Sequence, residues 1–347
     1  MNVRTPLTLA GVLTLALGLA ACGDDADESA DNGATDSSSG SEPDTEDTTG
    51  ATDDAAGTSA PGDDAGADGT FPVTVDTASG EVTVEEQPQR IVSLSPSATE
   101  ILFEIGAGDQ VVAVDSFSTY PEGVPTTDLS GFEPNVEAVV GYEPDLVVVS
   151  NDANDLVASL EAIDVPVIVS PAPTTVEDGW DGMAALGLAT GHVDETAATI
   201  ADLREQVDQA FASAPETDGE ELRVYHELDD SYYSASSASF IGDVYAQMGA
   251  VNIADEADTD GTGFPQLTEE SIIEADPQLI VITDQVSYTA EDVANRPGWS
   301  EIDAVRNDNI VVVDADIASR WGPRLPQLVS TVADALTEVE VGAPAGR

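Results

Sequence analysis

Two stretches of this chain repeat one another. Asn135–Val149 and Thr268–Ile282 lie 133 residues apart and share the same order of residue types. In each, a helix-capping residue is followed two positions later by a glutamate, Glu137 or Glu270, and then by a proline and an apolar run of strand type. A short helix, a turn and a buried strand used twice at this spacing predict two similar lobes, each able to bury its own core. Two such lobes predict a cleft between them, where ligands usually bind.

Apolar segments typical of strands alternate with segments of helical periodicity throughout the rest of the chain. This alternation predicts an α/β protein with mainly parallel sheets. A small hairpin is expected over 71–84, and short buried strands are expected at 90–94, 111–114, 146–149, 165–169, 223–226 and 310–313. Residues 193–213 show helical spacing over an unusual length. We interpret them as one long helix that joins the lobes, with an ordinary surface helix as the alternative.

The N-terminus indicates an exported protein. An apolar run too short to span a bilayer leads into Leu19-Ala-Ala-Cys22, and Cys22 is the only cysteine, so no intramolecular disulfide can form. These features predict a cleaved export signal over 1–21. The last four residues resemble the bacterial lipoprotein signal, which implies a lipidated Cys22 and anchoring to the outer face of the cytoplasmic membrane. An ordinary signal peptide with an incidental cysteine is the alternative.

The composition is strongly acidic. Residues 23–70 hold 15 acids and no lysine or arginine, which predicts an extended tether over 22–70. The whole chain has a formal net charge of −59 and lacks lysine, and this argues against nucleic acids and anionic membrane surfaces as partners. We interpret the acidity as a sign of a saline habitat. The predicted domains are the tether, an N-terminal lobe at 71–192, a connecting helix at 193–214 and a C-terminal lobe at 215–347.

Several motifs occur in a fixed order over residues 71–340. They are Arg90-Ile-Val-Ser-Leu-Ser-Pro-Ser-Ala-Thr-Glu-Ile-Leu102, Phe117-Ser-Thr-Tyr-Pro121, Glu143-Pro-Asp-Leu-Val147, Phe264-Pro-Gln-Leu-Thr-Glu-Glu-Ser-Ile272 and Gly322-Pro-Arg324. As a set they resemble the helical-backbone (class III) substrate-binding lipoproteins of ABC importers for cobalamin and ferric siderophores. The resemblance implies two α/β lobes joined by one long helix. It also implies a monomer that delivers an intact metal chelate to a permease dimer with its ATPase, without a cofactor of its own.

Candidate ligand-binding residues lie in loops beside the predicted strand ends. Ser95, Pro96 and Ser97 open a helix, where free backbone N–H groups favour polar or anionic ligand groups, although a plain helix cap would explain them too. A large, partly apolar ligand needs rigid aromatic surfaces. Loop aromatics suited to this task are Phe117, Tyr120, Phe132, Phe264 and Trp321, with loop packing as the alternative for each. The resemblance places Phe117, Phe132 and Phe264 at cleft positions.

Two arginines flank Trp321 in the sequence. Arginine suits carboxylate or phosphate groups, so we predict that Arg320 contacts ligand and that Arg324 is structural. An internal salt bridge is the alternative. His192 and His226 are the only histidines, and no His, Cys and Asp residues have metal-ligand spacing, so no protein metal site is predicted.

Catalytic motifs are absent from the sequence. There is no Gly-x-Ser-x-Gly, no phosphate-binding glycine-rich loop and no His-Glu-x-x-His, so we predict a binding protein and not an enzyme. A chelate-processing enzyme and a surface sensor that binds without transport stay open as alternatives.

The repeated glutamates carry two interpretations. An acid in the first turn of a helix stabilises it by about 0.3–1 kcal/mol, which alone would account for Glu137 and Glu270. The resemblance implies instead that glutamates at these positions pair with permease arginines, and we therefore predict a docking role. Because residues 193–213 contain no proline or glycine, we also expect little movement of the lobes on binding.

Overall fold

The computed structural model describes residues 70–215 and 221–339. All that follows concerns the compact unit Ala60–Arg347, and within it only those residues. The predicted signal peptide, Cys22 and the tether up to residue 69 lie outside the described residues.

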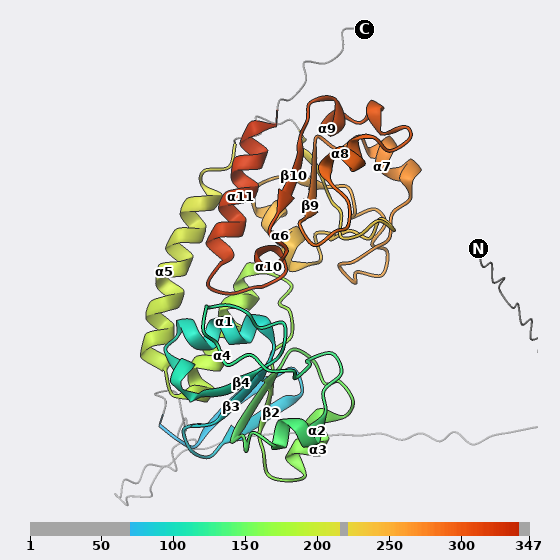
Figure 1. Ribbon diagram of the computed structural model, residues 1–347. Coiled ribbons are helices and arrows are strands. Elements are labelled where there is room, and N and C mark those ends of the chain that lie inside the picture. The colour runs from blue at the N-terminus through green and yellow to red at the C-terminus, as the bar shows by residue number, and fades with distance from the viewer. Residues whose placement is uncertain (1–69, 216–220, 340–347) are drawn as a thin grey trace, which may run out of the picture. The chain divides into compact units, whose positions relative to one another are not determined.

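The first lobe is built on a four-stranded parallel sheet in the order β4-β3-β5-β6. Helices α1 and α4 cover one face of this sheet, and α2 and α3 cover the other (Figure 1). Because both faces are buried, the strands consist of valine, isoleucine and leucine, apart from Ser93 in β3 and Ala113 in β4. The elements are β3 Ile91–Leu94, α1 Pro96–Glu104, a 3-10 turn Ala107–Gln110, β4 Val111–Val114, α2 Val136–Val140, β5 Leu146–Val149, α3 Leu156–Glu161, β6 Val167–Val169 and α4 Val176–Thr190. The predicted hairpin precedes them, with β1 Val73–Thr77 antiparallel to β2 Gly80–Val84.

The second lobe repeats this design with the strand order β10-β9-β7-β8, again parallel throughout. Helices α6 and α11 cover one face, and α7, α8 and α9 cover the other. The elements are β7 Arg223–His226, α6 Phe240–Gln247, β8 Val251–Asn252, α7 Glu269–Ala275, β9 Leu279–Thr283, α8 Ala290–Ala294, a 3-10 turn Trp299–Glu301, α9 Asp303–Arg306, β10 Ile310–Val313, α10 Ala315–Ala318 and α11 Leu325–Glu338.

The two sheets correspond strand by strand, and this correspondence follows the sequence repeat. When β3 is matched to β7 and β5 to β9, the strand orders are the same and the registers agree, with Ile91 opposite Leu146 and Val224 opposite Leu279. The helix caps agree as well. The Asn135 side chain accepts a hydrogen bond from Ala138 N at 2.9 Å, and the Thr268 hydroxyl accepts one from Ser271 N at 3.1 Å. The prediction of two similar α/β lobes is confirmed.

The repeat is longer than the sequence comparison indicated, because it includes an arginine at the start of each first strand. Arg90 Nε donates to the carbonyl oxygen of Glu143 at 2.9 Å, and Arg223 Nε donates to that of Asp276 at 3.1 Å. Both acceptor residues adopt a left-handed backbone, with φ of 49° and 46°, immediately before the repeated proline. Each arginine therefore binds the turn that follows the repeated helix.

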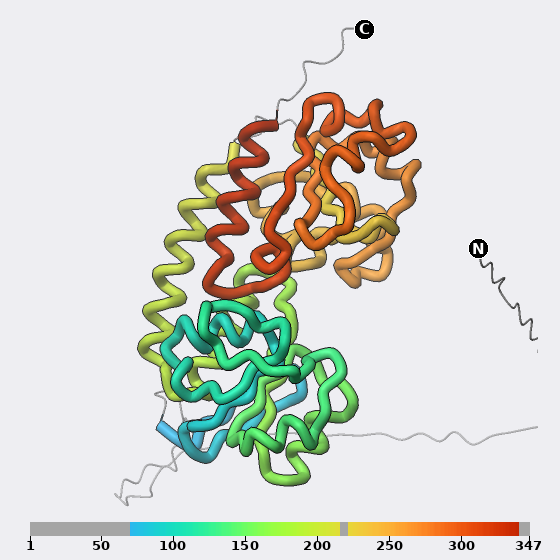
Figure 2. The backbone as a smooth tube through the Cα atoms, viewed as in Figure 1, coloured from blue at the N-terminus to red at the C-terminus, as the bar shows by residue number. Residues whose placement is uncertain are grey.

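One long helix, α5, follows the first lobe and spans Val193–Phe211. It packs against α4 and α11, so that it lies beside helices of both lobes (Figure 2). Leu203 and Val207 on its buried face join a hydrophobic cluster that holds residues of both sheets. The predicted connecting helix is present and ends three residues before the expected boundary at 214. The small lobe movement expected from this helix stays a prediction.

Candidate functional site

Hydrogen bonds fix the loop that carries Phe117 at the carboxyl end of β4. The buried Asp115 follows this strand, and its Oδ1 accepts a hydrogen bond from Ser118 N at 2.9 Å. The Thr126 hydroxyl donates to the Ser118 carbonyl oxygen at 2.9 Å, and the Thr99 and Ser118 hydroxyl oxygens are 3.0 Å apart. With its main chain held in this way, the loop leaves the Phe117 side chain 52% exposed.

Asp115 is the buried acid of this loop. Burial raises the pKa of its carboxyl group, while the hydrogen bonds from Ser118 and the charge of Arg320 act in the opposite direction. Because its carboxylate accepts main-chain and side-chain hydrogen bonds, Asp115 serves to shape the loop.

Phe132 lies on a second loop, directly beside Phe117. Gly131 is required before it, because a Cβ at this position would collide with the carbonyl oxygen of Leu94. The Ser130 hydroxyl oxygen accepts from Glu133 N at 3.0 Å and closes the turn. The rings of Phe117 and Phe132 meet edge to face with centroids 5.6 Å apart, and Phe132 is 71% exposed. Two of the predicted aromatics thus form one exposed apolar surface.

The second lobe exposes aromatics in the loops before α7. Phe264 and Tyr233 are both about half exposed. The loop before Phe264 is held by Asp258, which accepts hydrogen bonds from the Ser236 hydroxyl at 2.6 Å and from Gly263 N at 3.0 Å. The Ser236 hydrogen bond is the main reason that the pKa of Asp258 is lowered.

The residues at the start of α1 are largely buried. The Ser95 hydroxyl oxygen accepts from Ala98 N at 3.3 Å, and Pro96 occupies the first turn. Ser95 and Ser97 are both almost fully buried. The helix cap left open as an alternative is present for Ser95, and the ligand-binding role of Ser95, Pro96 and Ser97 stays a prediction.

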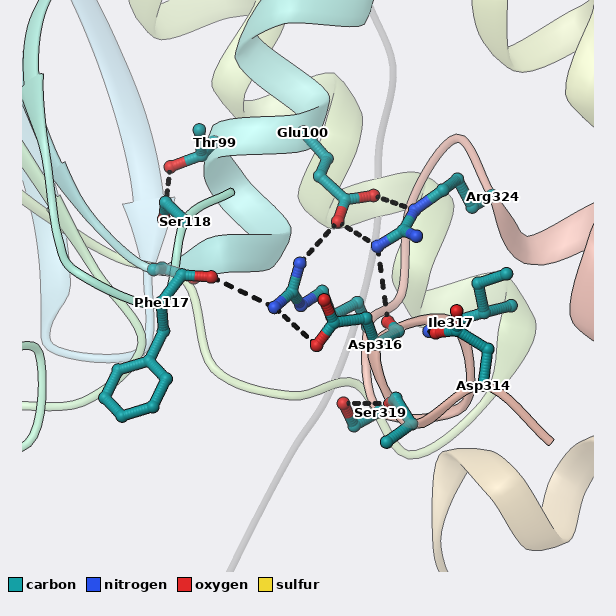
Figure 3. A network of polar contacts seen from close by, with 12 residues as sticks. Thr99, Glu100, Phe117, Ser118, Asp314, Asp316, Ile317, Ser319 and Arg324 are labelled. Atoms are coloured by element: carbon teal, nitrogen blue, oxygen red, sulfur yellow. Dashed lines mark hydrogen bonds and ion pairs between the residues drawn. The ribbon is translucent and has the colours of Figure 1, made fainter. Parts of the chain in front are cut away.

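Arg320 and Arg324 converge on one buried carboxylate, that of Glu100 on α1 (Figure 3). Arg320 Nη1 lies 3.1 Å from Glu100 Oε1, and Arg324 Nε lies 2.8 Å from Glu100 Oε2. Arg320 Nη2 also donates to Asp316 Oδ1 at 2.7 Å. The internal salt bridge that the sequence left open is therefore present for both arginines, and contact between Arg320 and ligand stays a prediction.

Trp321 lies between these arginines and is 8% exposed. It borders a cavity of about 370 Å³ whose apolar wall includes Ile168 and Pro171.

The two histidines have protein partners. His226 Nδ1 lies 2.8 Å from the Tyr245 hydroxyl oxygen, and complete burial lowers the pKa of His226 to about 4. His192 Nδ1 lies 3.1 Å from the carbonyl oxygen of Thr190. Within 70–215 and 221–339, no three His, Cys, Asp or Glu side chains are arranged to hold a metal ion.

Glu137 and Glu270 occupy equivalent positions in the first turns of α2 and α7. Both side chains are exposed. Neither carboxylate has a hydrogen-bond or ion-pair partner in the part of the chain that the structure describes.

Comparison with known proteins agrees with this architecture. Residues 91–317 match the family model described as periplasmic binding protein. A cobalamin-binding protein of Halobacterium salinarum is 35% identical over 276 residues, which cover 77% of this chain and 74% of that protein. The chain belongs to the periplasmic binding protein family.

Two further similarities are to a lipoprotein sequence and to a solved structure. The uncharacterized ABC transporter substrate-binding lipoprotein YvrC of Bacillus subtilis is 33% identical over 278 residues, covering 77% of this chain and 86% of that one. The crystal structure of the periplasmic vitamin B12-binding protein BtuF of Vibrio cholerae has the same fold, with a TM-score of 0.61 and 24% identity over 72% of this chain and 97% of that one. No helix within 70–215 and 221–339 has the length and apolar character needed to cross a bilayer.

Sequence reasoning missed a second buried ion pair in this binding protein. Glu227 follows β7 and is fully buried, and its two carboxylate oxygens accept from Arg296 at 2.6 and 2.7 Å. The Tyr225 hydroxyl donates to the same carboxylate at 3.1 Å, and the Arg296 guanidinium lies 4.5 Å from the centre of the Trp299 ring. Among 68 acids, neither Glu227 nor Glu100 carried a signal that set it apart.

Proposed function

We propose that this protein is the extracytoplasmic substrate-binding component of an ABC importer and that its ligand is an intact metal chelate of the cobalamin or ferric-siderophore type. The observation that carries the proposal is the exposed pair Phe117 and Phe132, which meet edge to face on two fixed loops. Relatives named as a cobalamin-binding protein and as an ABC transporter substrate-binding lipoprotein support it.

The physical basis is the unfavourable free energy of exposing the apolar Phe117–Phe132 surface to water. Exposed rings held on ordered loops bind a large, partly apolar ligand without losing further side-chain freedom. In the proposed site Phe117 and Phe132 contact one side of the chelate and Phe264 contacts another. Ser95, Pro96, Ser97, Arg320 and Trp321 complete the proposed set. No residue is proposed to bond the metal or to catalyse a reaction.

The test is a titration of the full-length protein with cyanocobalamin, a ferric siderophore and haemin, followed by tryptophan fluorescence. We expect one chelate to bind, and Phe117→Ala and Phe132→Ala each to weaken its binding about tenfold, since a stacked aromatic contributes roughly 1.4 kcal/mol. Ile163→Ala is the control, because Ile163 is about as exposed as Phe117 but follows α3 and belongs to neither of these loops. Binding of free Zn²⁺ or Mn²⁺ in place of every chelate would contradict the proposal.

Delivery is the second part of the proposed function. We propose that lipidated Cys22 anchors the protein to the outer face of the cytoplasmic membrane, and that Glu137 and Glu270 dock onto basic pockets of a permease dimer. The exposure and lack of partners of both carboxylates support this role. Ion pairs across an interface mainly set orientation and encounter rate.

Charge reversal tests the docking role. In vesicles containing the permease, we expect Glu137→Arg and Glu270→Arg to lower uptake with ligand affinity unchanged, and the double variant to lower it further. Glu161→Arg, at an exposed acid on α3, is the control for a change in net charge. If uptake survives the double reversal, stabilisation of the two helices is the whole role of these glutamates.

A further inference from the structure

The aromatic loop of the first lobe is contacted by two arginines of the second lobe. Arg320 Nη2 donates to the carbonyl oxygen of Phe117 at 3.0 Å. The Arg324 guanidinium carbon lies 4.5 Å from the centre of the Tyr120 ring, which is the geometry of a cation–π contact. Both arginines lie between α10 and α11, and the residues that they contact follow β4. The segment between α10 and α11 thus contacts the loop after β4 at two residues, Phe117 and Tyr120.

The arginines are themselves fixed before they reach this loop. Both are at least nine-tenths buried, and both bind the carboxylate of Glu100 on α1. Arg320 is also paired with Asp316 at 2.7 Å. A buried guanidinium with charged partners on two sides has few alternative positions, because leaving them would expose an unpaired charge to an apolar interior. The Phe117 carbonyl therefore meets a donor that is already in place.

The Phe117 carbonyl and the Tyr120 ring depend on these contacts more than the rest of the loop does. Ser118 is tied to Asp115, Thr99 and Thr126, all within the first lobe. In the part of the chain that the structure describes, the Phe117 carbonyl accepts no hydrogen bond other than the one from Arg320. Loss of the arginine contact would free the peptide that sets the direction of the Phe117 side chain without unfolding the loop.

We propose that Arg320 and Arg324 are positioning residues, which set the Phe117–Tyr120 loop from the opposite lobe and so fix the exposed Phe117–Phe132 surface. The consequence of this positioning for ligand binding rests on the proposed function, whereas the positioning of the loop itself does not. A shift of the second lobe relative to the first would be transmitted to the aromatic surface through the Phe117 carbonyl. The relation between the lobes would thereby influence ligand affinity through the aromatic surface, in addition to the direct contact proposed for Arg320.

The first test needs no ligand. In the full chain, hydrogen exchange of the 115–121 segment is compared between the wild type and Arg320→Lys, which keeps the buried positive charge but loses the planar fork. We expect exchange about tenfold faster in the variant, the factor for one lost charge-assisted hydrogen bond. Arg204→Lys is the matched control, because Arg204 pairs with Glu177 at the surface and should leave this segment unchanged. Should Arg320→Lys fail to fold, Tyr120→Leu removes the other contact from the loop side and keeps the buried pair.

The second test uses cyanocobalamin as the probe in a double-mutant cycle with Phe117→Ala. Arg320→Lys should weaken binding about fivefold when the Phe117 ring is present and much less when it is absent, because Arg320 acts on affinity mainly by positioning that ring. Equal weakening in both backgrounds, or unchanged exchange of the 115–121 segment, would overturn the positioning role. If the wild type binds no chelate while exchange in Arg320→Lys is accelerated, the positioning role stands and the proposed ligand class fails.

Discussion

The two lobes share one backbone frame but differ at the carboxyl ends of their matched strands. Ser93 and Leu94 end β3, and His226 with the following Glu227 stands at the equivalent positions of the second lobe, 133 residues later. In the first lobe the Ser93 hydroxyl oxygen accepts from Thr99 at 2.9 Å, and no charge is buried at these two positions. In the second lobe a histidine and a carboxylate are buried there.

The difference shows where each lobe finds its counter-charges. Glu227 is neutralised by Arg296 of the same lobe, beneath the rings of Trp299 and Tyr288. Among the described residues, Glu100 of the first lobe is neutralised only from the second lobe, by Arg320 and Arg324. The second lobe therefore neutralises its buried carboxylate with its own arginine, whereas the buried carboxylate of the first lobe depends on arginines of its neighbour. The two lobes share a frame, but only the second is self-contained in its buried charges.

The largest expected effect comes from breaking the self-contained pair. Glu227→Gln keeps the shape of the side chain but leaves the Arg296 guanidinium buried without a counter-charge, which costs about 3–5 kcal/mol. Urea unfolding of the full chain measures this loss. Arg204→Gln is the matched control, because its pair with Glu177 is exposed and contributes less than about 1 kcal/mol. Similar losses for the two variants would show that the second lobe does not rely on its internal pair.

The frame shared by the lobes was predictable because it rests on local patterns. Capping by Asn135 and Thr268 and the apolar runs at 111–114, 146–149 and 310–313 give the elements their bounds directly. The two-residue strand β8 and the short helices α8, α9 and α10 were not predicted, since so few residues carry no periodicity.

The buried ion pairs could not be predicted from the sequence, for a different reason. Glu227 and Arg296 are 69 residues apart, and Glu100 and Arg320 are 220 apart, so only the folded chain brings them together. The exposed aromatics were identified because large apolar residues in loops are conspicuous in a chain with 5% aromatics.

The second-largest expected effect is a loss of stability at acidic pH that comes from His226 in the second lobe, because the equivalent Ser93 of the first lobe does not titrate. Burial lowers the pKa of His226 to about 4 from its ordinary value near 6.5. Between these values the unfolded chain binds a proton that the folded chain does not, so stability is lost as the pH falls below 6.5, by about 2 kcal/mol at pH 5. His226→Asn retains a polar partner for Tyr245 but does not titrate there.

The measurement that isolates this titration is the stability difference between the wild type and His226→Asn at pH 7 and at pH 5. We expect the wild-type advantage to shrink by about 2 kcal/mol on acidification. In hydrogen exchange, β7 should lose protection before β3 does, because Ser93 has no proton to gain. A constant difference between the two proteins across this range would contradict a neutral, buried His226.

The smallest expected effect concerns the arginines that the lobes have kept in common. Arg90 and Arg223 each bind the turn after a repeated helix, and each backbone N–H at these residues donates at 2.8 Å to the matched side chain, Asp145 or Gln278.

Arg90→Gln and Arg223→Gln should each cost about 1 kcal/mol, the usual contribution of one net hydrogen bond, with Arg223 slightly costlier because its side chain is only 30% exposed. Because the sites lie in separate lobes, the two losses should add within about 0.5 kcal/mol in the double variant. Urea unfolding of the single and double variants measures this. If one substitution were strongly destabilising and the other neutral, the shared hydrogen bonds would stabilise only one of the two lobes.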